Sequence, residues 1–214
     1  MRSFHEVLYS DKISEIIISD DASDLSTYYR LENAVGDMDK VKLYRNTSNI
    51  GCYQNKKRAI ELSSCDYCII LDSDNIISTS FLDKIFEQQW DEHTILAPDM
   101  GEPALNYKAF SGTVLTRENI SGLLDVGNMA MLLNTMNYFV NRSEYLRVFD
   151  DSVEPWTSDS VYQIFRWLEA GNKIHIVDGL EYHHEIHKDS HYATHNQKNP
   201  GFYEETLSKL RSLK

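Results

Sequence analysis

Two aspartates with one residue between them follow directly on a short apolar run. The run of Ile69, Ile70 and Leu71 predicts a buried strand, and Asp72 and Asp74 come where that strand leaves the sheet. Burying two anions is costly, so we expect these carboxylates to meet solvent, a cation or a ligand. Carboxylates that point the same way can hold a hard divalent cation, which can in turn hold a diphosphate. An acidic turn after a strand is the structural alternative.

A second acidic pair follows another apolar strand. The segment 15–19 ends at Asp20 and Asp21, and the first half of the chain alternates strands and helices. This alternation predicts an α/β fold with a mostly parallel sheet flanked by helices, in which ligands bind beyond the carboxyl ends of the strands. Both acidic clusters then lie at one edge of the sheet. A turn or a helix cap is the alternative for Asp20 and Asp21.

The expected elements follow the apolar periodicity. In the first half, helices at 2–11, 24–35, 52–64 and 79–90 alternate with strands at 15–19, 41–44, 69–71 and 94–97. The second half is less regular: residues 99–130 are loop-rich, and strands are expected at 137–140, 173–177 and 180–183. Helices are expected at 143–148, from 157 or 158 to about 170, and at 201–213. No segment is rich enough in Gly, Ser or Pro to separate two domains, so a single domain over 1–214 is expected.

Composition excludes several classes of protein. The formal net charge is −12 and basic residues form no stripe, so nucleic acid is not an expected partner. Hydrophobic residues make up 42% of the chain, which argues against wholesale disorder. No apolar run is long enough for a transmembrane segment, and the N-terminus has no signal-peptide core. Three cysteines without a secretion signal indicate reduced thiols and a cytoplasmic location.

Three short motifs occur in a familiar order. They read Asp20-Asp21-Ala22-Ser23, Asn49-Ile50-Gly51 and Asp72-Ser73-Asp74. In this order they resemble the family 2 glycosyltransferases, which have the GT-A (Rossmann-like) fold. Two later segments, Trp156-Thr157-Ser158-Asp159 and Tyr182-His183-His184, resemble the family's acidic pair at a helix start and its late histidine segment.

The sequence also departs from the family pattern. The family begins with a strand that helps hold the nucleotide base, whereas this chain opens at what would be the following helix. The neighbouring strand would then have an open edge, which invites pairing or a homodimer. Ser158 stands where the family often has Glu, and Lys56-Lys57 where it often has Arg-Asn.

The resemblance implies a metal-dependent, inverting glycosyltransferase that moves a sugar from a nucleoside diphosphate sugar, most often a UDP-sugar, to an acceptor hydroxyl. Residues 1–100 would bind the nucleotide and residues 101–214 the acceptor, a glycan or another hydroxyl compound. Asp159 would be the general base, with simple helix capping as its alternative. Trp156, Asn137 and Tyr138 could line the acceptor side or belong to the core.

The same resemblance implies which residues would bind the sugar donor and the metal ion. Asp74 would bind Mn²⁺ or Mg²⁺ directly, and an added imidazole would favour Mn²⁺. The third ligand would be His184, then His183, then His187. The residues that would contact the nucleotide sugar are Asp20, Asp21, Lys56, Asp72 and Ser73. Of the first two, Asp21 is favoured over Asp20 as the contact to the base or ribose. The alternative for Lys56 is a solvated lysine without a role in binding.

Two other functions fit the sequence less well. A sugar nucleotidyltransferase shares the fold, but it would carry a Gly-rich basic loop near the N-terminus, and this chain has none. A degenerate GT-A domain that serves as a binding or scaffold module would explain the absent first strand. Intact Asp72, Asp74 and Asp159 argue against that alternative.

Overall fold

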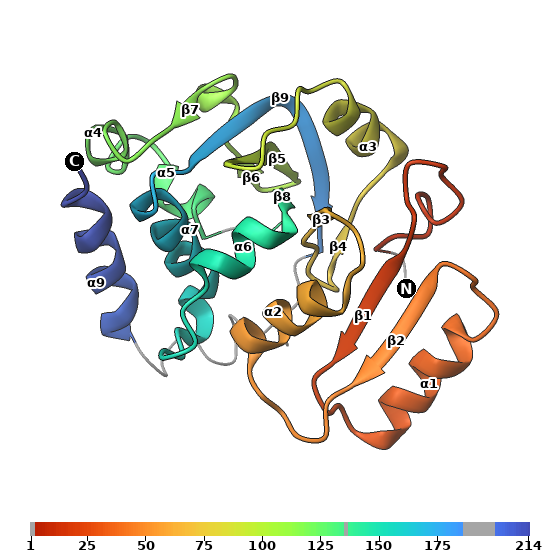
Figure 1. The fold of residues 1–214 in the computed structure, drawn as a ribbon. Helices are drawn as coiled ribbons and strands as arrows, with labels where there is room; N and C mark the ends of the chain where they lie inside the picture. Colours follow the sequence, from red (N-terminus) through yellow and green to blue (C-terminus); the bar gives the residue numbers. More distant parts are fainter. Residues whose placement is uncertain (1–2, 135–136, 186–199) are drawn as a thin grey trace.

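The computed structural model describes residues 3–134, 137–185 and 200–214 and shows an α/β protein, as the sequence predicts (Figure 1). Its first half alternates strands and helices in the expected order. The strands are β1 (Ile16–Asp20), β2 (Val41–Arg45), β3 (Tyr67–Ile69), β4 (Asn75–Ile76), β5 (Thr94–Glu102), β6 (Leu105–Asn106), β7 (Val114–Leu115), β8 (Phe139–Asn141) and β9 (Lys173–His184).

The helices mostly begin where capping residues predict. The α-helices are α1 (Leu25–Val35), α2 (Cys52–Leu62), α3 (Thr79–Phe86), α4 (Ile120–Leu123), α5 (Met129–Leu132), α6 (Arg142–Val148), α7 (Asp159–Glu169) and α9 (Pro200–Arg211). Two 3₁₀ turns, η1 (Lys108–Phe110) and η2 (Trp156–Ser158), complete the set. Asp24 caps α1 through a 3.0 Å hydrogen bond that its carboxylate accepts from Thr27 N.

Three expected elements differ from the structure. The buried strand expected at 69–71 is β3 at Tyr67–Ile69, and of Ile69, Ile70 and Leu71 only Ile70 is buried. Residues 3–9 form turns rather than the predicted helix: Phe4 O accepts hydrogen bonds from Val7 N and Leu8 N, and the pattern does not continue. The strands expected at 173–177 and 180–183 are one strand, β9, which runs through Gly179 at a φ of 70°. Its partner β5 shifts register between Pro98 and Met100, so an irregular stretch stays within the sheet.

The strands form two sheets instead of one. β1 and β2 pair in parallel as a two-stranded sheet. The second sheet has seven strands in the order β3-β8-β5-β9-β4, with β6 on β5 and β7 on β9. In this sheet only β5 and β9 run parallel, so the sheet is mixed where the sequence predicted mostly parallel pairing. The β/α alternation of the first half does not extend to β8, which pairs antiparallel with both β3 and β5.

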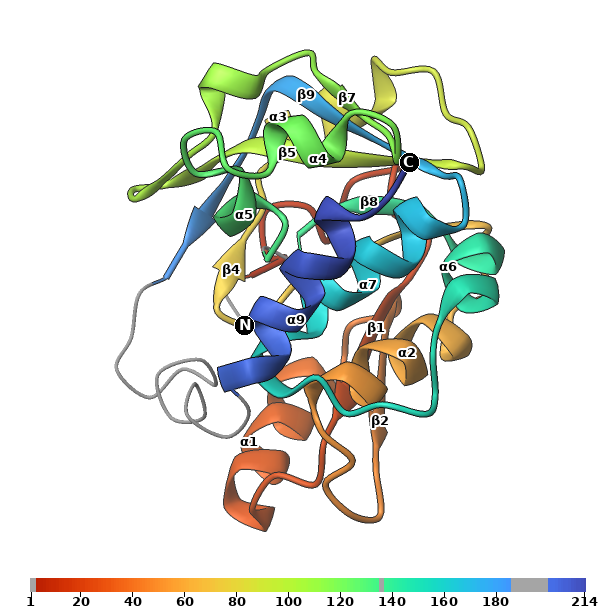
Figure 2. The ribbon, with the colours of Figure 1, turned by 90° about the vertical axis from the view of Figure 1, so that its left-hand side faces the viewer.

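The larger core lies around α7. Nine of its eleven residues are buried, so this helix is enclosed on most sides. α9 packs alongside it (Figure 2). A second apolar cluster joins α3 to β9 and to the N-terminal turn, through Val7, Phe81, Ile85 and Leu180. Within the described ranges no helix has both the length and the apolar character needed to cross a membrane.

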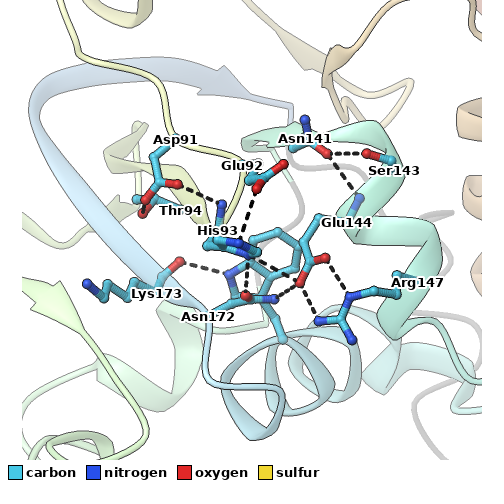
Figure 3. Close-up of polar contacts among 11 residues, drawn as sticks. Asp91, Glu92, His93, Thr94, Asn141, Ser143, Glu144, Arg147, Asn172 and Lys173 are labelled. Carbon is cyan, nitrogen blue, oxygen red and sulfur yellow. Dashed lines mark hydrogen bonds and ion pairs between the residues drawn. The ribbon is translucent and has the colours of Figure 1, made fainter.

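A cluster of polar contacts links the start of β5 to α6 and to the turn before β9 (Figure 3). Glu144 is 6% exposed, and its carboxylate accepts hydrogen bonds from Arg147 Nε at 2.6 Å and from Asn172 Nδ2 at 2.5 Å. His93 Nδ1 lies 3.1 Å from Asn172 Oδ1. The hydrogen bonds from Arg147 lower the pKa of Glu144, and burial opposes them.

Replacing this buried carboxylate should cost stability. We expect Glu144→Gln to lower the free energy of unfolding by about 1–2 kcal/mol at pH 7, because a charge-assisted bond is lost and a buried donor loses its acceptor. The pKa of Glu144 is lower in the folded state than the unfolded value of 4.5, so its ionised form stabilises the fold above pH 4.5. This stabilisation is lost as the pH falls through the folded-state pKa, so the difference in stability between wild type and variant should vanish in acid. Urea unfolding at pH 7 and pH 3 measures this. Glu92→Gln, at an exposed member of the same cluster, should change little.

Candidate functional site

The carboxyl ends of β1 and β3 open into one large cleft. Its volume is about 2170 Å³, and it lies between the two-stranded sheet, the Asp72–Asp74 turn and the start of α7. The predicted site residues that line it are Asp21, Lys56, Asp72, Ser73, Asp74, Asp159 and His184. Asp20 and His183 are not among the lining residues.

The centre of the cleft is an ion-paired triad. Lys56, in the second turn of α2, places Nζ 2.8 Å from Asp72 Oδ1 and 2.9 Å from Asp159 Oδ2. Burial disfavours a charged ammonium, but the two carboxylates outweigh burial and hold the pKa of Lys56 well above its ordinary value. Burial raises the pKa of Asp72, and Lys56 opposes that shift. The lysine is therefore a fixed cation between two acids rather than a solvated side chain.

Asp159 is held at the start of α7 by a strained turn. Its side chain is 9% exposed and lies in the first helical turn, where the helix dipole favours a carboxylate. Trp156, three residues earlier, has a φ of 51°, which is unusual for a residue with a side chain. Its carbonyl accepts a hydrogen bond from Cys52 Sγ at 3.2 Å, which joins this turn to the start of α2. A strained backbone conformation of this kind persists only where the surrounding structure holds the residue in place.

The turn from Asp72 to Asn75 is shaped by a buried amide. Asn137 Oδ1 accepts hydrogen bonds from Asp72 N and from Asn75 Nδ2, both at 3.1 Å. Asn75 Oδ1 in turn lies 2.7 Å from His184 Nδ1. Asn137 therefore positions the Asp-Ser-Asp segment, a role that the sequence did not predict for it.

The two adjacent histidines of β9 face opposite ways. Asn75 is the register partner of His184 and Ile76 that of His183. Since neighbouring side chains of a strand alternate between faces, only one of the two can reach the cleft, and it is His184. His183 is exposed, and His187 lies outside the described residues.

Asp20, the last residue of β1, and Asp21, which follows it, have separate environments. Asp20 is buried and its Oδ2 accepts a hydrogen bond from Arg45 Nη1 at 3.0 Å. The Arg45 guanidinium lies over the ring of Tyr28, 4.5 Å from the ring centre. Asp21 accepts hydrogen bonds from Ile50 N at 2.8 Å and Gly51 N at 2.9 Å. Asp20 thus belongs to the fold, whereas Asp21 orders the loop before α2 and still borders the cleft.

The donor atoms around the cleft are of the kinds that Mn²⁺ and Mg²⁺ accept. The carboxylates of Asp72 and Asp74 and the imidazole of His184 border the same space. Within the part of the chain that the structure describes, no three acidic, histidine or cysteine side chains lie close enough together to hold a metal ion. Mg²⁺-type ions commonly take one or two protein ligands and complete their shell with phosphate and water, which such a cleft allows.

The fold has known counterparts. Its central sheet flanked by helices is similar to that of the GT-A glycosyltransferases. Residues 2–102 match the family model described as Glycosyl transferase family 2, which confirms the resemblance carried by the three motifs. A comparison with curated proteins gives no match.

Solved structures agree on the fold. A crystal structure of S. aureus TarS, residues 1–349, is 16% identical with a TM-score of 0.67; the alignment covers 98% of this chain and 59% of TarS. The TarS complex with UDP is 15% identical with a TM-score of 0.65, over the same shares. GalNAc-T7 with UDP, GalNAc and Mn²⁺ is 14% identical with a TM-score of 0.60, over 91% of this chain and 48% of that one. The chain thus spans about three fifths of the TarS chain.

Proposed function

We propose that this chain is a metal-dependent, inverting glycosyltransferase that uses a nucleoside diphosphate sugar, with a UDP-sugar as the favoured donor. The observation that carries the proposal is the position of Lys56, which joins Asp72 after β3 to Asp159 at the start of α7. One acid from the first half of the chain and one from the second thereby border the same cleft. A donor site and a base for the acceptor need this proximity.

Each cleft residue has a role in this proposal. Asp159 takes the proton from the acceptor hydroxyl as the new glycosidic bond forms. Lys56 keeps that carboxylate in position, and its charge attracts the diphosphate of the donor. Asp72 and Ser73 contact the nucleotide sugar, and Asp21 contacts the base or ribose.

A divalent cation would be held by Asp74 and His184, with Mn²⁺ favoured by the imidazole. When bound, it supplies Lewis-acid stabilisation of the negative charge on the leaving diphosphate. GalNAc-T7, which shares the fold, was crystallised with Mn²⁺, and this supports the proposal.

Calorimetric titration with UDP tests the proposal. We expect Mn²⁺ to strengthen UDP binding, and Asp74→Asn to weaken the Mn²⁺-dependent binding by at least about tenfold, because an oxygen ligand loses its charge. Asp178→Asn is the matched control, since Asp178 is exposed on β9 and does not line the cleft. An equal, weak UDP affinity with and without Mn²⁺ would instead favour a scaffold module.

A further inference from the structure

Two contacts join α2 to α7 beside the cleft. The first is the ion pair already described, in which Lys56 Nζ lies 2.9 Å from Asp159 Oδ2. The second is a hydrogen bond that Tyr53 OH donates to Gln163 Oε1 at 3.1 Å. Tyr53 and Gln163 are both 0% exposed, so the second contact lies in the core.

The spacing of these four residues makes the two contacts neighbours. Tyr53 comes three residues before Lys56 on α2, and Gln163 comes four residues after Asp159 on α7. Residues three or four apart lie on the same face of a helix, about one turn from each other. The two contacts are therefore successive links between the same pair of helix faces. A rotation or a slide of either helix that changes one contact changes the other.

Neighbouring groups hold both partners of the buried hydrogen bond. The Tyr53 ring stacks on Phe149 with ring centres 4.1 Å apart, and it meets the Tyr162 ring edge to face with centres 6.1 Å apart. Burial raises the pKa of the Tyr53 hydroxyl, so it stays protonated and can donate. Gln163 Nε2 donates a longer hydrogen bond, of 3.5 Å, to Tyr145 O.

Stability alone does not account for a polar pair at this position. Burying a hydroxyl and an amide has a desolvation cost that their hydrogen bond only modestly exceeds. Two apolar side chains of similar size would fill the same space without that cost. A hydrogen bond adds direction, because its distance and angle are confined to a narrow range, whereas apolar contacts tolerate sliding. A buried polar pair can thereby specify the register of packed helices.

This arrangement assigns a role to the buried pair. We infer that Tyr53 and Gln163 are positioning residues: their hydrogen bond sets the register of α2 against α7 and so fixes where Lys56 holds the Asp159 carboxylate. The inference rests on the proposed function, in which Asp159 is the base. A base displaced by about 1 Å loses much of its rate, whereas donor affinity depends on other groups of the cleft.

Two variants separate positioning from stability. Tyr53→Phe removes the hydroxyl, keeps the ring and leaves Gln163 Oε1 buried without this donor. The double variant Tyr53→Phe/Gln163→Met removes both partners and replaces the amide with an apolar side chain of similar shape. The melting temperature should fall in the single variant, and the double variant should recover about half of that fall or more. The register constraint is absent from both variants.

Turnover should follow the register and not the stability. We expect kcat to fall by about 5–50-fold in both variants, with KM for the donor within about twofold of wild type. The measurement is UDP release from the donor and acceptor that the wild-type chain uses best. Tyr162→Phe is the matched control, because the Tyr162 hydroxyl donates to Asp150 Oδ2 at 2.6 Å and makes no link to α2. Its kcat should stay within about twofold of wild type.

The Lys56 ammonium provides a readout that does not require turnover. Its nitrogen lies between carboxylate oxygens of Asp72 and Asp159, so its protons should exchange slowly with water. Nitrogen-15 NMR of the full chain with labelled lysine measures this exchange. We expect the exchange to be at least about fivefold faster in Tyr53→Phe and in the double variant, and unchanged in Tyr162→Phe.

Three results would overturn the inference. The first is a double variant that regains kcat together with its melting temperature, because the hydrogen bond would then only stabilise the fold. The others are an unchanged Lys56 exchange rate in both Tyr53 variants and a loss of kcat in Tyr162→Phe as large as in Tyr53→Phe. If Tyr53→Phe does not fold, the double variant decides.

Failure of the proposed function would be recognised separately. It would show as wild-type UDP binding that Mn²⁺ does not strengthen. The exchange of the Lys56 protons would still report whether Tyr53 and Gln163 fix the ion pair, since that measurement needs neither donor nor acceptor.

Discussion

Asp159→Asn is expected to reduce kcat/KM by about 10²–10⁴-fold, the usual contribution of a general base. The amide keeps the size of the side chain but cannot accept the proton of the acceptor hydroxyl. UDP affinity should be retained within a few-fold, since Lys56 keeps its 2.8 Å contact with Asp72. The measurement is UDP release from the donor and acceptor that the wild-type chain uses best, with calorimetry for binding.

The control for this variant lies on the same helix. Glu169→Gln makes the same change of charge at the other end of α7, where the carboxylate pairs with Arg166 at the surface, and activity should be unchanged. If Asp159→Asn retained activity within about threefold of wild type, the base would have to be another residue.

Lys56→Met is expected to lower the free energy of unfolding by about 2–3 kcal/mol at pH 8. Removing one partner of a fully buried ion pair costs about 3–5 kcal/mol. The expected loss is smaller because 37% of the Asp72 side chain is exposed. Without the ammonium, Asp72 and Asp159 face each other uncompensated.

The loss should depend on pH with a defined sign. The raised pKa of Lys56 means that its stabilisation is complete below the unfolded value of 10.5 and is lost only as pH rises through the folded value. Wild type is therefore fully stabilised at pH 8. In the variant, the raised pKa of Asp72 favours protonation on folding, so the deficit should shrink as pH falls towards 4.

Urea unfolding at pH 8 and pH 4.5 measures both effects. Lys57→Met is the control, because the neighbouring lysine pairs with exposed Asp151 and Glu61, contacts worth about 0–1 kcal/mol. A Lys56→Met deficit no larger than the Lys57→Met deficit, or one that grew in acid, would show that the triad does not stabilise the fold.

Local patterns predicted most of the elements and part of the site. Apolar runs and capping residues placed β1, α1, β2 and α2 within a few residues of their observed ends. The same patterns placed acids at the end of β1 and shortly after β3. These features depend on neighbouring residues, through side-chain periodicity and local hydrogen bonds, so they can be inferred without knowing the rest of the fold.

Strand pairing could not be inferred in the same way. The antiparallel pairing of β8 with β3 and β5 joins residues that are far apart in sequence, and nothing local specifies it. This pairing also brings Asn137 beneath the Asp72 turn. A buried asparagine gives no sequence signal of the hydrogen bonds that it will make.

The sequence by itself determined that this chain forms an α/β fold with acidic residues at strand ends and an acid, Asp159, at a helix start. Only the tertiary structure showed that Asp20 is buried against Arg45, that His184 and not His183 lines the cleft, and that Lys56 lies between Asp72 and Asp159. The physical reason is the sequence separation over which each interaction acts. Periodicity and capping act over a few residues, whereas burial and ion pairing are set by segments that meet only after the chain has folded.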